Sequence, residues 1–161
     1  MKSHLFLVTV LLSAVAFFPE TSLAHDIASG CSSNTNVTIS NEAAFATLCS
    51  ATIVLTGHTH YCVATASAEA LSPGGTNNDY VFVISTASGG PGGDSAWERK
   101  IELNDNPGVD DPDTAVPSTV RYLTLGSGTY TFYWLAKPVD AGDANLTVAD
   151  YSMGVVCVDG L

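Results

Sequence analysis

The clearest pattern along the chain is an alternation of apolar and polar positions, which is most regular between residues 126 and 158. After a turn at 126–128, aromatic or apolar residues recur at every second position up to 136, and this period of two predicts a β-strand. Residues 146–158 alternate in a similar way, but Asp150 and Ser152 interrupt the apolar face, so a β-bulge is expected between Asp150 and Gly154. Because only the turn at 138–142 separates the two runs, the sequence predicts that they pair as an antiparallel hairpin.

Shorter runs with the same period predict further strands, and turn-forming residues separate them. These runs cover residues 36–39, 52–56, 61–71, 80–85, 97–103 and 119–125. One face of the run 61–71 consists of Cys62 and four alanines, so large residues of an opposite sheet, or a second subunit, must approach it closely. Phe132 and Trp134 are the expected fillers from an opposite sheet.

The alternation implies an all-β fold. One helical turn is expected within 41–48, where an Asn cap precedes several apolar residues, and no helical period is sustained elsewhere. About eight strands without an internal repeat predict an antiparallel β-sandwich of jelly-roll or Greek-key type.

The first 24 residues carry the three parts of a secretory signal peptide: a basic Lys2, an apolar centre over 5–18 and small residues ending at Ala24. The apolar centre is shorter than the roughly 18 to 20 residues that a membrane span needs. Removal of 1–24 leaves 25–161, which we expect to be one secreted or periplasmic β-sandwich domain with an N-terminal arm at 25–50. Asn36 and Asn145 begin N-glycosylation acceptor tripeptides, which matter only if the host glycosylates in this way.

The charge balance narrows the range of partners. The chain has 16 acidic and 5 basic residues, for a formal net charge of −11. Nucleic acids and anionic membranes need a basic surface, so the acidic composition argues against both as partners. A carbohydrate or a protein is the class of partner that remains, and the sequence does not determine the oligomeric state.

Four cysteines, Cys31, Cys49, Cys62 and Cys157, follow the signal segment, and an even number in an exported protein is typical of disulfides. Three connectivities are open. We expect Cys31 to pair with Cys49, which closes a short N-terminal segment, and Cys62 to pair with Cys157, since both lie in strand-like surroundings. No C-x-x-C spacing supports a zinc site instead.

The most polar stretch of the chain, 104–113, offers four carboxylates within one turn-rich segment. They are Asp105, Asp110, Asp111 and Asp113. Hard oxygen ligands of this kind suit calcium, although the spacing does not match an EF-hand loop. Aspartate beside proline and glycine is also ordinary turn chemistry, so a solvated turn and a calcium site are both open.

Histidine offers a second metal hypothesis. Signal removal would make His25 the N-terminal residue, whose amine and ring can chelate copper together, and His58 and His60 are the other two histidines that would be left. The arrangement resembles the histidine brace of copper monooxygenases and of some exported copper-binding proteins. The resemblance covers only His25 and an unplaced second histidine, and it implies copper binding as the alternative function.

No catalytic signature stands out. The chain lacks a G-x-S-x-G motif, and its cysteines are expected in disulfides, so we expect no enzyme. Tyr80, Trp97 and Tyr133 are the aromatic residues expected to contact a bound sugar. The sequence therefore predicts an exported, non-enzymatic β-sandwich with a binding or structural role, in which calcium assists the binding of a carbohydrate or protein.

Overall fold

A computed structural model describes residues 27–40, 43–72, 78–90, 98–103, 113–140, 142–143 and 145–160. The first five strands in this part of the chain are β1 (Ile27–Ser33), β2 (Val37–Ile39), β3 (Ala46–Leu55), β4 (His60–Ser72) and β5 (Asn78–Ser85). The other five are β6 (Glu98–Leu103), β7 (Asp113–Ala115), β8 (Ser118–Leu125), β9 (Gly128–Pro138) and β10 (Leu146–Asp159). None of the described residues is helical, so the predicted all-β fold is confirmed.

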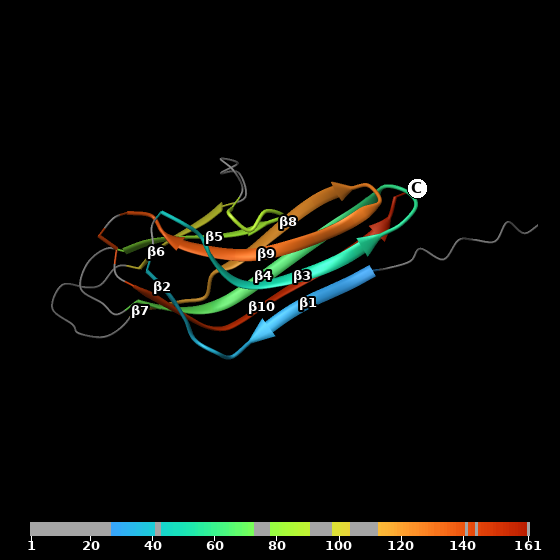
Figure 1. The fold of residues 1–161 in the computed structure, drawn as a ribbon. Coiled ribbons are helices and arrows are strands. Elements are labelled where there is room, and N and C mark those ends of the chain that lie inside the picture. The colour runs from blue at the N-terminus through green and yellow to red at the C-terminus, as the bar shows by residue number, and fades with distance from the viewer. Residues whose placement is uncertain are drawn as a thin grey trace, which may run out of the picture.

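The strands form two antiparallel sheets that lie face to face (Figure 1). In the first, called sheet A, β10 and β4 are central, β1 and β2 pair in succession with the outer edge of β10, and β7 and β8 pair in succession with the outer edge of β4. The second, called sheet B, has the order β3-β9-β5-β6. Each sheet is therefore four strand positions wide.

The pairing is nested around the middle of the chain. β5 pairs with β6, β4 with β7 and β8, β3 with β9, and β1 and β2 with β10. A chain that folds back on itself in this way, and then wraps so that successive pairs fall in alternate sheets, is a jelly roll. Counting β1 with β2 and β7 with β8 as broken single strands gives the eight strands that the sequence predicts.

The core lies between the sheets, and the alanine face of β4 explains how closely they pack. Cys62, Ala64, Ala66, Ala68 and Ala70 are all buried in it. Phe132 and Trp134 from β9 belong to the same core and have no exposed surface, so the opposite sheet covers the alanines as expected. The Phe82 and Trp134 rings pack in a tilted pair with centroids 5.9 Å apart, a geometry that suits the quadrupoles of aromatic rings.

A bulge in β10 reverses the alternation of that strand. The register against β4 shifts between Ala149 and Ser152, and Asp150 has a positive φ of 43°, a conformation that Asp tolerates better than most side chains. Leu146 and Val148 face the core before the bulge, whereas Tyr151, Met153 and Val155 face it afterwards. The expected bulge is confirmed, at the beginning of its predicted range, and it leaves Val156 and Val158 exposed on the outer face.

Two expectations were wrong. β9 and β10 do not form a hairpin, because β3 and β5 occupy both edges of β9, and the chain crosses to sheet A after Pro138. The helical turn expected in 41–48 is wrong from Ala46, where β3 begins. A register shift between Thr47 and Cys49 places Leu48 in the core from an irregular strand and not from a helix.

The segment 25–50, expected to be an arm, takes part in both sheets. β1 pairs with β10 over its whole length, β2 pairs with the beginning of β10, and β3 is an edge strand of sheet B. His25 and Asp26 lie outside the described residues.

The two disulfides have the pairing that the sequence favoured. Cys31 in β1 bonds to Cys49 in β3 and so ties sheet A to sheet B, with Cα atoms 6.0 Å apart. Cys62 and Cys157 are directly opposite each other on β4 and β10, with Cα atoms 4.0 Å apart, and their bond lies within sheet A.

The outer face of sheet B is partly covered by its own chain. Val81, Val83 and Leu135 point away from the core and yet are buried. At one end of this face Phe45 packs so closely against Gly90 that a Cβ added there would lie 2.5 Å from its ring. The Lys137 ammonium lies 5.1 Å from the centre of the same ring, within the range of a cation–π contact. Within the described residues no helix is long and apolar enough to cross a membrane.

Candidate functional site

The outer face of sheet A carries a cluster of exposed apolar side chains. We call this cluster the apolar patch; it consists of Tyr61, Val63, Val120, Tyr122, Val156 and Val158. Val63 is half-buried, and the other five are between 39% and 65% exposed. Single exposed apolar residues are ordinary on protein surfaces, but a contiguous group marks an interaction site.

Strand pairing makes the patch contiguous. Val63 lies between Val156 of β10 and Tyr122 of β8, its direct neighbours on either side. Tyr61 pairs with Val158 in the next row along β4, and Thr65 pairs with Val120 in the row on the other side. Cross-strand neighbours of this kind have Cβ atoms about 4.5 to 5.5 Å apart, so the six side chains form one continuous surface.

The patch lies in an uncharged region. From Tyr61 to Ser67, the outward positions of β4 and their partners on β1, β10 and β8 are Tyr, Val, Thr, Ser, Ala or Gly. The nearest charged positions on this face within the described chain are Glu69 and Asp150, both toward the β7 end of the sheet. Among the described residues, the outward carboxylates of sheet A therefore lie away from the patch.

A hollow borders the patch on the side of the bulge. It has a volume of about 290 Å³ and is lined by side chains of β4, β8 and β10, among them Thr65, Ser118, Val120 and Gly154. Gly154 leaves this wall open, because the nearest atom to a Cβ added there would be Thr65 Oγ1 at 3.9 Å. The hollow is large enough to accept one side chain.

The strands that carry the patch are held from the core side. Arg121 lies between Val120 and Tyr122 but points inward, and its Nη1 donates a 2.8 Å hydrogen bond to the backbone oxygen of Ile84 in sheet B. This contact fixes the edge strand β8 against the other sheet. The Cys62–Cys157 disulfide joins the two central strands directly beneath Val63 and Val156. The patch is therefore displayed on a rigid support.

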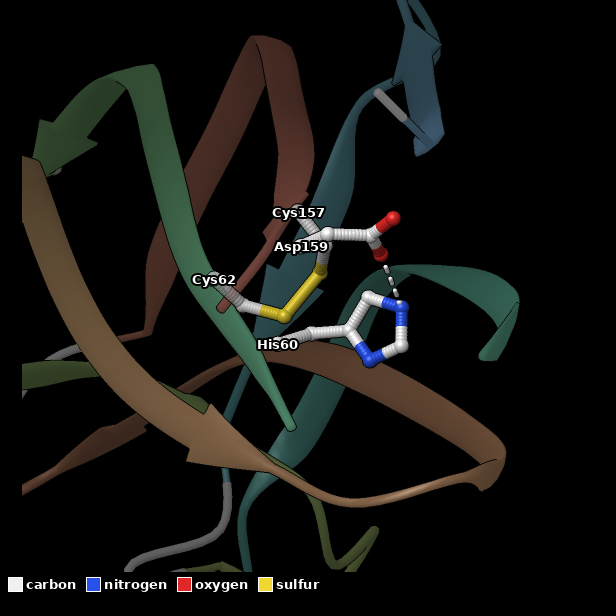
Figure 2. Close-up of a disulfide and its surroundings, with 4 residues drawn as sticks. All are labelled: His60, Cys62, Cys157 and Asp159. Atoms are coloured by element: carbon white, nitrogen blue, oxygen red, sulfur yellow. Dashed lines mark ion pairs between the residues drawn. A yellow bond between two sulfur atoms is a disulfide. The ribbon is translucent and has the colours of Figure 1, made fainter. Parts of the chain in front are cut away.

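Next to that disulfide, a buried histidine closes the end of sheet A (Figure 2). His60 is 1% exposed, and its Nε2 lies 2.8 Å from Oδ1 of Asp159, the residue opposite it on β10. His60 Nδ1 has no hydrogen-bond partner among the described residues. Gly160 N donates to Thr59 O at 2.7 Å, so the C-terminal end of β10 is fastened to the β3–β4 turn, as Figure 1 also shows.

The structure separates the histidines that the copper hypothesis groups. His58 is exposed in the turn before β4, whereas His60 is buried against Asp159. In the described part of the chain, no three His, Cys, Asp or Glu side chains are grouped closely enough to hold a metal ion. His25 lies outside that part, so its role in copper binding stays a prediction.

The calcium hypothesis also falls mostly outside the described residues. Asp105, Asp110 and Asp111 are not described, and Asp113 is described only as the first backbone position of β7, opposite Ser72. Another acidic loop residue, Asp143, accepts hydrogen bonds from the backbone N–H groups of Val139 and Asp140 at 3.1 and 2.8 Å. It thereby closes the β9–β10 loop.

Of the three aromatic residues expected to contact a sugar, Tyr80 is corrected by the structure. It has no exposed surface, because it points into the core from β5, and its hydroxyl lies 3.5 Å from Ser72 Oγ. Burial raises the pKa of Tyr80, the Ser72 contact opposes that rise, and the charge of Asp143 adds to it. Tyr133 is half-buried on the outer face of sheet B, and Trp97 lies outside the described residues.

The residues of the patch were missed as a site, although a signal was present. Tyr61 with Val63, Val120 with Tyr122 and Val156 with Val158 are apolar pairs two positions apart, each on the face opposite a buried series. Strands that are apolar on both faces are typical of sheets with something on either side. That pattern in three neighbouring strands predicts a second covered face.

Comparison with known proteins adds a weak structural likeness. No known sequence family matches the chain, and no curated protein is similar to it in sequence. Among solved structures, it is similar to that of Eiger TNF from S. frugiperda, with a TM-score of 0.47 and 9% sequence identity over 84% of this chain and 94% of that one.

Proposed function

We propose that the protein is an exported, non-enzymatic binding protein that contacts a protein partner through the apolar patch. The observation that carries the proposal is the exposure of two tyrosines and three valines side by side, in rows of sheet A whose described outward residues carry no charge. Tyrosine is enriched at protein interfaces, and charged residues are depleted at their centres.

The composition of the patch favours a protein over a carbohydrate. Sugar sites combine an aromatic platform with precisely placed polar groups that fix the orientation of the hydroxyls. Here the aromatic rings are flanked by valines, and among the described outward residues of the same rows the polar neighbours are Ser and Thr hydroxyls. Aliphatic surface of this kind is stabilised by other apolar side chains.

Export is supported by the covalent structure. Two disulfides, one between the sheets and one within sheet A, persist in oxidising compartments and are rare in the cytosol. The predicted signal peptide at 1–24 agrees with them. Assistance by calcium at Asp105, Asp110, Asp111 and Asp113, and copper binding at His25 with His58 or His60, stay predictions.

Photocrosslinking in the organism that makes the protein tests this function. A photoreactive phenylalanine analogue placed at Tyr122 should give protein adducts of discrete mass. The same analogue at Val54, which is 58% exposed on the outer face of sheet B, is the matched control and should give none. Absence of adducts at position 122, or equal adducts at both positions, would refute the function.

A further inference from the structure

The apolar patch and the hollow lie on the same face of sheet A. A side chain that protrudes from the patch of one molecule can therefore enter the hollow of a second molecule. Tyr122 is the most exposed residue of the patch at 65%, and the hollow of about 290 Å³ lies on the other side of Val120 from it. We propose that a second copy of this chain binds the outer face of sheet A, with Tyr122 of each copy entering the hollow beside Gly154 of the other. This inference rests on the proposed function, because it names the partner.

Charge permits a second copy as the occupant. Two chains of net charge −11 repel each other wherever their acidic surfaces meet. Among the described residues, the outward positions from Tyr61 to Ser67 and their partners on β1, β8 and β10 contain no charged residue, so two copies can meet at these positions without opposing carboxylates.

The size of the uncharged region permits a weak dimer. Four strand positions at about 4.8 Å, and a length of about 23 Å from Tyr61 to Ser67, give these rows roughly 440 Å². An interface of standard size buries about 800 Å² on each partner, and weak or transient interfaces are smaller. Contact over these rows therefore suits a dimer of the weak class.

A protruding side chain and a hollow on the same face permit a closed arrangement. A two-fold axis that passes between Tyr122 and the Gly154 hollow makes two identical contacts, since each copy provides one side chain and one hollow. Such two-fold contacts are by far the commonest in soluble homo-oligomers. The dimer closes on itself and leaves no apolar patch exposed.

Sedimentation equilibrium of the disulfide-bonded protein tests the proposal. The wild-type chain should dimerise at micromolar concentration, and Tyr122→Thr, which removes both contacts, should weaken dimerisation about 100-fold. Val54→Thr is the matched control, because it makes the same kind of change at an exposed strand position of sheet B and should leave the dimer intact. Thermal unfolding confirms that each variant is folded.

Mixing two variants tests the reciprocal contact. Gly154→Val should fill the hollow from its open wall and weaken its own dimer about as much as Tyr122→Thr does. In a mixture of the two variants, Tyr122 of one chain still finds an open hollow on the other, so one of two contacts survives. The mixed dimer should form about tenfold more tightly than either variant dimer.

Several results would overturn the inference. One is a wild-type chain that stays monomeric up to about 1 mM. Another is a dimer that Tyr122→Thr weakens no more than Val54→Thr does. The third is a mixed dimer of Tyr122→Thr and Gly154→Val that forms no more tightly than the dimer of either variant alone. A monomer that still gives adducts of another mass from position 122 in photocrosslinking would refute the second copy while supporting the proposed function.

Discussion

The outer faces of the two sheets differ in the solvent exposure of their apolar residues. On sheet B, Val81, Val83 and Leu135 point away from the core and are nevertheless buried. On sheet A, Tyr61 and Tyr122 occupy equivalent outward positions next to valines and are more than half exposed. Both faces carry outward apolar residues, and on sheet B three of them are covered within this chain although Val54 at its edge is not.

The difference can be traced in part to the turns beside sheet B. Phe45, just before β3, packs against Gly90 after β5 and lies near the Lys137 ammonium, so two turns meet over that face. On the apolar patch the outward side chains of three strands remain open to solvent. Contiguous exposed apolar residues of this kind are the basis of the proposed binding function.

Removing the Cys62–Cys157 disulfide has the largest expected effect on this contrast. The bond closes a loop of 95 residues, so replacing both cysteines by alanine should lower the free energy of unfolding by about 4.7 kcal/mol in the chain-entropy model. Because it joins the central strands under the patch, hydrogen exchange should rise in β4 and β10 more than in β5 and β9.

The Cys31–Cys49 pair provides the control for that experiment. Its loop spans 18 residues, so the same double replacement should cost about 3.2 kcal/mol and should loosen the contact between the sheets. Equal exchange in all four central strands after loss of Cys62–Cys157 would show that the bond does not support the face of sheet A in particular.

A matched pair of valines tests the contrast directly. Val83→Asp places a carboxylate on the covered face of sheet B, where the side chain has no exposed surface, and should lower the free energy of unfolding by about 3 to 4 kcal/mol. Val156→Asp makes the same change on the apolar patch, where the side chain is 48% exposed, and should cost less than about 1 kcal/mol in the monomer. Urea unfolding of both variants measures the difference, and similar losses would remove the distinction between the faces.

The smallest effect concerns the pH dependence contributed by Tyr80. Its pKa is raised above the ordinary 10.0, chiefly by burial, so the folded protein holds this proton more tightly than the unfolded chain. The stability linked to this group is fully present below pH 10.0 and is lost as the pH rises through the folded pKa. Tyr80→Phe should flatten the alkaline fall of the unfolding midpoint, whereas Tyr122→Phe on the open face should leave that fall in place.

The alternation of residues was enough to predict the fold, because burial on one side of a strand leaves a period of two. The alanine face of β4, its aromatic cover from β9 and the bulge in β10 all follow from that period. The false hairpin shows its limit. Nearness in sequence predicts pairing only when an edge is free, and β3 and β5 take both edges of β9.

The site was harder to predict for a physical reason. β1, with the sequence IASGCSS, is too polar and small to be recognised as a strand, yet it pairs along β10. Which of the two outer sheet faces is exposed to solvent depends on the turns that cover them. These turns are far away in sequence, so the pattern within a strand does not predict the exposure of its outer face. Tyr80 and Tyr122 are both tyrosines on alternating strands, and only the structure distinguishes the buried one from the exposed one.

The bulge at Asp150 determines which side chains in the second part of β10 face solvent and which face the core. Had the strand continued its alternation through that position, the side chains beyond it would have been exchanged between inside and outside, with Val156 toward the core and Cys157 toward solvent. The covalent bond to Cys62 and the surface beside Tyr122 thus share one origin. A single inserted residue determines both. Deleting it would therefore exchange the buried and the exposed side chains of β10 beyond the bulge, although none of those residues would itself be changed.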